Sequence, residues 1–73
     1  MKTRLLLVDD LQLFREGFRA LMQGREELEL VAESAGAPDA YSQFDRVRPD
    51  VVILSAHVTG VLSLLVSTAT FVL

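Results

Sequence analysis

Two acidic residues stand side by side where an apolar run ends, and they are the first candidates for chemistry. Asp9 and Asp10 follow directly after the run from Leu5 to Val8. Adjacent carboxylates supply the oxygen ligands that a hard divalent cation such as Mg²⁺ prefers. Aspartate is also common at strand ends and as a helix N-cap. The pair taken alone therefore fits both a metal site and a structural cap.

A second apolar run, from Val51 to Leu54, ends in a hydroxyl group, that of Ser55. A serine nucleophile needs a partnering base and a third group that orients this base. His57 is the only histidine of the chain, and no orienting group is apparent. One histidine without any cysteine is also a weak basis for a transition-metal site. We therefore do not predict an enzyme, and a Ser–His hydrolase is the least favoured interpretation.

The elements that must position these residues alternate along the chain. The short apolar run before Asp9 is typical of a strand buried on both faces. Asp10 is expected to cap the helix that follows, and Gly24 is expected to stop it. This helix should turn one apolar face toward the core, made of Phe14, Phe18, Leu21 and Met22.

The second half of the pattern repeats the first. Residues 28–33 alternate in part, as an edge strand with one wetter face would, and residues 34–37 form a turn. Ala40, Phe44 and Val47 then recur at helical spacing, with Tyr41 at the margin of the core. Strands that alternate with helices indicate a parallel sheet with right-handed crossovers. Its ligand crevice should lie beyond the carboxyl ends of the strands, where Asp9, Asp10 and Ser55 stand.

Length and charge exclude several classes of function. The chain has 73 residues, a net charge of −3 and no cysteine. A single small domain is therefore expected, without disulfide bonds, and the cytoplasm suits it. The lysines and arginines form no stripe that could neutralise phosphates, so direct binding of nucleic acid is not expected. The uncharged stretch 61–73 is too short to span a bilayer, which needs roughly 20 apolar residues.

Three segments, taken in order and at their spacing, resemble the receiver domain of bacterial response regulators. They are residues 6–10 (Leu-Leu-Val-Asp-Asp), 13–17 (Leu-Phe-Arg-Glu-Gly) and 48–52 (Arg-Pro-Asp-Val-Val). The similarity is strongest to receivers that precede a helix-turn-helix output domain of the LuxR type. It implies an α/β, flavodoxin-like parallel sheet of βαβαβ order that is incomplete at its C-terminus. Residues 1–60 would form this partial receiver domain, and residues 61–73 a divergent tail with a short helix or a fourth strand.

The resemblance also implies a chemistry. In this family the acid pair and an aspartate after the third strand hold Mg²⁺, and that aspartate accepts a phosphoryl group from a sensor histidine kinase. Asp9 and Asp10 match the pair, whereas Ser55 occupies the acceptor position. Thr68 or Thr70 is the candidate for the switch hydroxyl, and no lysine follows Lys2. We therefore expect a degenerate receiver of a two-component phosphorelay, which binds Mg²⁺ weakly through Asp9 and Asp10 and is not phosphorylated.

Two alternatives stay open. The chain could be a truncated interaction module that pairs with a homologous response regulator or a kinase. It would then form a homo- or hetero-oligomer through an open sheet edge and the apolar tail. It could also be a non-functional gene fragment.

Overall fold

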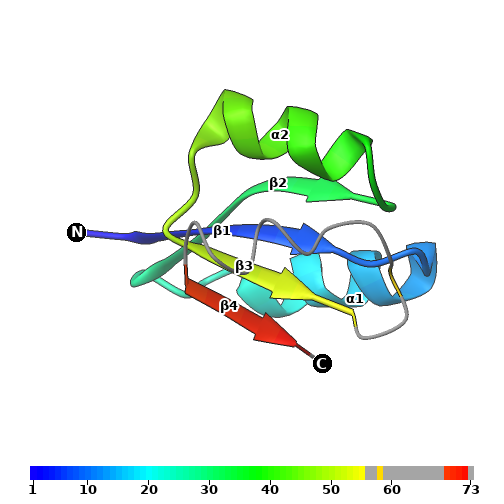
Figure 1. Cartoon of the computed structure of the whole chain (residues 1–73). Coiled ribbons are helices and arrows are strands. Elements are labelled where there is room, and N and C mark those ends of the chain that lie inside the picture. Colours follow the sequence, from blue (N-terminus) through cyan, green and yellow to red (C-terminus); the bar gives the residue numbers. More distant parts are fainter. Residues whose placement is uncertain (56–57, 59–68, 73) are drawn as a thin grey trace.

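The computed structural model describes residues 1–55, 58 and 69–72 of the chain. Strands and helices alternate through residue 54, and a further strand follows near the C-terminus (Figure 1). The elements are β1 (Thr3–Val8), α1 (Gln12–Met22), β2 (Leu28–Ser34), α2 (Asp39–Val47), β3 (Val51–Leu54) and β4 (Ala69–Val72). The expected short helix in the tail falls on residues outside those described.

The strands form one sheet in the order β2-β1-β3-β4, and every neighbouring pair is parallel. β1 lies in the interior, and β2 is an edge strand, as the alternation of its residues predicts. Figure 1 shows α1 and α2 on opposite faces of the sheet. This strand order is the beginning of the flavodoxin-like order. The predicted α/β fold with a parallel sheet is therefore confirmed.

The tighter half of the core lies between the sheet and α2. Ala40, Phe44 and Val47 are the buried residues of α2, as their helical spacing predicts. The first two pack on alternate residues of the two central strands, namely Leu6, Val8, Val52 and Leu54. Tyr41 packs at the margin of this cluster. Burial of each such large side chain contributes about 1.5–3 kcal/mol, so this layer carries much of the stability.

The other half of the core is looser than the sequence predicts. No residue of α1 is buried, and Phe14 and Leu21 keep 39% and 64% of their surface exposed. The prediction that these two side chains belong to the core is therefore wrong. The ring centroids of Phe14 and Phe18 lie 6.2 Å apart, and the two rings contact each other along the helix. The physical reason is position: α1 packs against the edge strand β2, and it is the only described helix on this face.

Two turns set where the strands begin. Gly24 adopts a φ of 81° just after α1, which confirms its predicted role as a helix stop. At the end of α2, Arg48 is left-handed with a φ of 46°. Beyond it the amide of Arg4 donates to the carboxylate of Asp50 (2.8 Å), and the amide of Asp50 donates to the carbonyl of Arg4 (2.8 Å). This reciprocal pair starts β3 in register beside β1. In the described part of the chain, no helix has the length and apolarity needed to cross a membrane.

Candidate functional site

Three buried polar residues mark the carboxyl edge of the sheet. Asp9, Ser34 and Ser55 are 4%, 2% and 4% exposed, and they are the buried polar residues of the described chain. The amide of Asp9 donates to the carbonyl of Ser34, and the amide of Ser55 donates to the carbonyl of Val8, both at 2.9 Å. These two hydrogen bonds thus link the carboxyl ends of β2, β1 and β3 side by side. As the sequence predicts, Asp9 and Ser55 stand at the same edge of the sheet, after the neighbouring strands β1 and β3.

The acid pair divides into one buried and one exposed residue. The Oδ1 atom of Asp9 accepts a hydrogen bond from the amide of Leu11 at 2.8 Å, which folds the loop before α1. Leu11 is the N-cap residue of α1, and no side chain caps it. The prediction that Asp10 caps this helix is therefore wrong. The helix begins one residue later than that prediction requires, and the side chain of Asp9 fixes the turn instead. Asp10, in contrast, is exposed to solvent.

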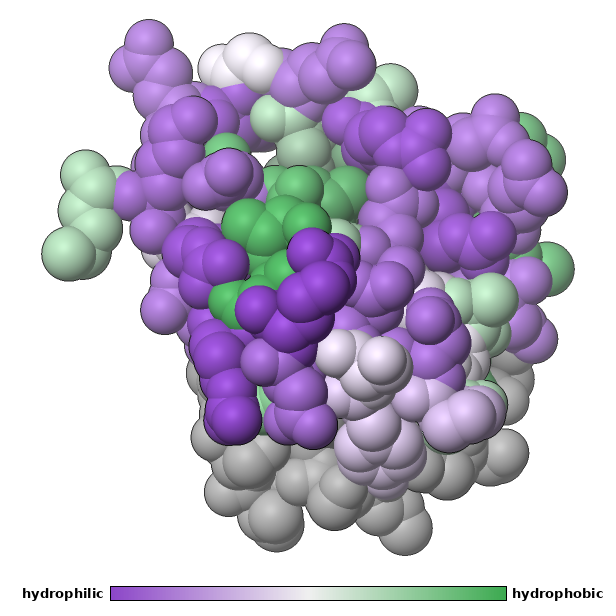
Figure 2. Space-filling model, turned by 90° about the horizontal axis from the view of Figure 1, so that it is seen from above, coloured by the Kyte–Doolittle hydropathy of each residue, from purple (hydrophilic) through white to green (hydrophobic). Residues whose placement is uncertain are grey.

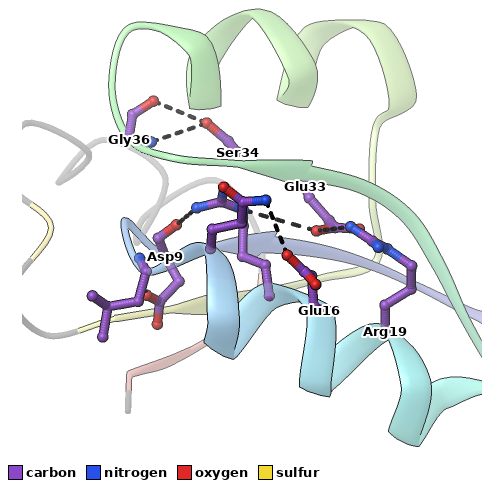
Figure 3. Close-up of polar contacts among 9 residues, drawn as sticks. Asp9, Glu16, Arg19, Glu33, Ser34 and Gly36 are labelled. Carbon is purple, nitrogen blue, oxygen red and sulfur yellow. Dashed lines mark hydrogen bonds and ion pairs between the residues drawn. The ribbon is translucent and has the colours of Figure 1, made fainter.

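Ser34 was not singled out by the sequence, because residues 34–37 read as an ordinary turn. It is the last residue of β2, and its hydroxyl donates to the carbonyl of Gly36 (2.9 Å) and accepts from the amide of Gly36 (3.2 Å) (Figure 3). Its side chain thus closes the β2–α2 loop. The carbonyl of Ser55 accepts a hydrogen bond from the amide of Val58 at 3.1 Å.

An arginine and glutamate network borders the acid pair, and sequence reasoning missed it. Arg19 binds the carboxylate of Glu33 through two hydrogen bonds of 2.7 and 2.9 Å, from Nε and Nη2 (Figure 3). Arg15 lies 3.9 Å from the same carboxylate through its Nε atom, and its Nη1 atom donates to the main-chain carbonyl of Asp9. The network joins α1, the end of β1 and the edge strand β2.

The hydrogen bond and charge of Glu33 raise the pKa of Arg19. As far as Arg19 is concerned, the stability that this pair adds to the folded state is fully present below the ordinary arginine pKa. It is lost only as the pH rises through the pKa of Arg19 in the folded state. Arg19 therefore keeps its charge throughout the neutral range.

The donor set at this edge suits a weakly held hard cation. Mg²⁺ usually keeps several water molecules and takes one or two carboxylates from a protein. Asp9 and Asp10 offer two carboxylates after β1, and Ser55 offers a neutral hydroxyl oxygen after the neighbouring strand β3. Within the described residues no group of three or more histidine, cysteine or acidic side chains gathers around a common centre. The residues thus fit Mg²⁺, with one carboxylate fewer than a tight site of this kind would use.

One other candidate site residue, Thr70, does not reach this edge. Thr70 pairs with Val52 in the middle of β4, whereas Val72 pairs with Leu54 at the carboxyl end. Thr70 therefore does not stand at the carboxyl edge as a switch hydroxyl after the fourth strand should. His57 and Thr68 lie outside the described residues.

Comparison with known proteins agrees with this architecture. No family model matches the chain. The transcriptional regulatory protein BtsR of Salmonella typhi is 43% identical over 51 residues, which are 70% of this chain and 21% of that protein. The crystal structure of a LuxR-family two-component response regulator from Aurantimonas sp. SI85-9A1 is 37% identical. It superposes with a TM-score of 0.72 over 82% of this chain and 43% of that one. The chain carries a receiver-like domain of the response regulators.

A further relative extends the match along this receiver-like domain. The transcriptional regulatory protein DegU of Brevibacillus brevis is 30% identical over 60 residues, 82% of this chain and 25% of that protein. The receiver-like domain thus spans about a fifth to a quarter of the length of the curated relatives it matches. The predicted family is confirmed by these similarities, and the solved structure that the chain resembles is of the LuxR family, as the predicted resemblance implies. Most of the relatives are named as regulators of transcription.

Proposed function

We propose that this receiver-like domain is a signalling module of a two-component system that binds Mg²⁺ weakly and does not accept a phosphoryl group. Asp9 and Asp10 are its metal ligands. The domain acts by binding a sensor histidine kinase or a homologous response regulator in the cytoplasm, and not by catalysis. The similarity to regulators such as BtsR and DegU supports the signalling class.

The observation that carries this proposal is the residue that follows β3. Ser55 is 4% exposed at the strand end next to Asp9, where an acceptor carboxylate would have to stand. A neutral hydroxyl adds no charge for a divalent cation, and it is a poor nucleophile without a general base. The edge can therefore retain a cation through the acid pair while lacking the group that would form an acyl phosphate.

A combined titration tests both parts. The purified chain is incubated with Mg²⁺ and acetyl phosphate, and intact mass and thermal unfolding are followed together. We expect a small Mg²⁺-dependent rise in Tm, because a ligand that binds only the folded state stabilises it. No phosphoryl group should be added. A base-labile gain of one phosphoryl group would refute the degenerate assignment, and an unchanged Tm would refute the metal site.

A second candidate function is that of an interaction module, and the exposed apolar residues of α1 favour it. Leu13 and Leu21 are 84% and 64% exposed, and β2 and β4 are the edges of the sheet that the described residues form. Such edges and apolar surfaces are sites at which other chains add or pack. Size-exclusion chromatography with a full-length response regulator tests this function, and a shared, earlier-eluting peak supports it. Non-cooperative unfolding of the isolated chain would favour the third possibility, a non-functional fragment.

A further inference from the structure

We propose that Arg15 is a positioning residue for the carboxylate pair, because it holds the peptide between Asp9 and Asp10 and so directs Asp10 toward the cation. This inference rests on the proposed Mg²⁺ site. Arg15 contacts the main chain of Asp9 and is not itself a metal ligand. It acts on the carboxylate ligands indirectly, through the backbone that carries them.

Hydrogen bonds hold the peptide groups on both sides of Asp10, and Arg15 holds the first of them. Its Nη1 atom donates to the carbonyl of Asp9, and its amide donates to the carbonyl of Leu11 at 3.1 Å. The amide of Leu11 in turn donates to Oδ1 of Asp9 at 2.8 Å. The peptide plane before Asp10 is thus held by Arg15, and the plane after it is held by the side chain of Asp9. Two fixed planes leave little freedom to the φ and ψ angles of Asp10, so Arg15 contributes to the direction of its Cα–Cβ bond.

Arg15 is itself held by its surroundings. Its side chain is 18% exposed and that of Glu33 is 19% exposed, whereas Arg19 is 54% exposed. Glu33 is anchored by its paired contact with Arg19, and it draws the guanidinium of Arg15 toward β2 through the 3.9 Å ion pair. A guanidinium fixed in this way retains its hydrogen bond at a smaller cost in side-chain entropy. Residues that orient metal ligands commonly change metal affinity by 10–100-fold when removed.

A positioning role and a purely electrostatic role of Arg15 predict opposite changes in Mg²⁺ affinity when its charge is removed. Removal of a positive charge close to a cation site should strengthen cation binding, because like charges repel. Loss of a group that aims a ligand should weaken binding. The network offers a matched pair: Arg15 and Arg19 both lie near the carboxylate of Glu33, but Arg15 alone is hydrogen-bonded to Asp9. A change at each of them separates the two effects.

The test compares Arg15→Met, Arg19→Met and Arg15→Lys with the unchanged chain. Methionine retains an apolar stem without a charge or a donor, and lysine retains both in a shorter, less directional form. Circular dichroism first shows that each variant is folded. The amide nitrogen resonance of Asp10 is then measured without metal, since it reports the hydrogen bond on the preceding carbonyl. Mg²⁺ affinity is measured by titration of the same resonances.

Arg15→Met should shift the Asp10 resonance and weaken Mg²⁺ binding about tenfold. Arg19→Met should leave that resonance in place, with affinity unchanged or slightly increased, and Arg15→Lys should recover part of the loss. Equal effects of the two methionine variants would overturn the positioning role. Failure of the unchanged chain to bind Mg²⁺ refutes the proposed metal site alone. In that case an Asp10 resonance shifted by Arg15→Met and not by Arg19→Met still supports the positioning of the loop, and an unshifted one overturns it.

Discussion

The amide of Ser55 donates to the carbonyl of Val8 at 2.9 Å, and this bond places the hydroxyl-bearing residue at the strand end beside Asp9. The contact continues the ladder between β1 and β3 by one step, since Val8 pairs with Leu54. The position of Ser55 is thus set by strand register and not by its own side chain. A different side chain at this position should therefore stand in the same place.

Replacement of Ser55 by aspartate should rebuild a three-carboxylate edge. Without metal, we expect Ser55→Asp to lose roughly 1–3 kcal/mol of unfolding free energy, because a charged group enters a buried position next to Asp9. Mg²⁺ should restore this stability, and its affinity should increase on the order of tenfold, since ligand charge tightens binding of hard cations. Urea unfolding with and without Mg²⁺ measures both. Ser55→Asn is the uncharged control, and equal affinities of the two variants would contradict the location of the site.

Asp9 has two separable roles, as a loop acceptor and as a charge. Asp9→Asn retains an oxygen that can accept from the amide of Leu11, whereas Asp9→Ala does not. Alanine should therefore cost about 1 kcal/mol more unfolding free energy than asparagine. Both variants should lose the Mg²⁺-dependent rise in Tm. Thermal and urea unfolding check these expectations, and a metal response that survives in Asp9→Asn would exclude this carboxylate as a ligand.

The two faces of the sheet should differ in their tolerance of cavities. Phe44 is 9% exposed within the α2 layer, and Phe14 is 39% exposed on α1. Phe44→Ala should therefore lose about 3–5 kcal/mol of unfolding free energy, and Phe14→Ala less than about 1.5 kcal/mol. Chemical denaturation compares them. Since Phe44→Ala approaches the whole stability of a chain of this size, Phe44→Leu, at about 1–1.5 kcal/mol, provides a milder measurement. Equal losses at both phenylalanines would contradict the looser packing of α1.

Arg48 holds a backbone conformation that glycine adopts more easily. Its φ is 46°, and among the described residues its side chain makes only an exposed ion pair with Asp45, at 3.6 Å. Arg48→Gly should therefore raise the unfolding free energy by up to about 1 kcal/mol, because the strain of a left-handed residue exceeds the small value of such a pair. Arg46→Gly, inside α2, should instead lower it by about 1 kcal/mol. Equilibrium unfolding of both variants checks the sign, and destabilisation by Arg48→Gly would show that its side chain matters more than its backbone.

Much of the fold follows from patterns that are local in the sequence. The run from Leu5 to Val8 and the helical spacing of Ala40, Phe44 and Val47 predict elements that the structure contains. The predictions for these segments hold because the apolar residues are covered by neighbouring elements. β1 lies between two strands of the sheet, and α2 packs over the centre of the sheet. The same logic fails for α1. Its apolar face is as regular, yet Phe14 and Leu21 remain exposed, since periodicity reports an apolar face and not what covers it. On the other side of the molecule, where α2 lies, Figure 2 shows a patch of apolar surface bordered by polar surface.

By itself, the sequence determined the alternation of strands and helices and the placement of Asp9, Asp10 and Ser55 after strand ends, because these features depend on neighbours in the chain. Only the tertiary structure decided that Asp9 is buried and shapes its own loop while Asp10 is exposed. It also decided that Arg15 reaches the carbonyl of Asp9 under the control of Glu33. The physical reason is that β2 must lie beside β1 before Glu33, which is 18 residues beyond Arg15, can contact that guanidinium and hold it in place.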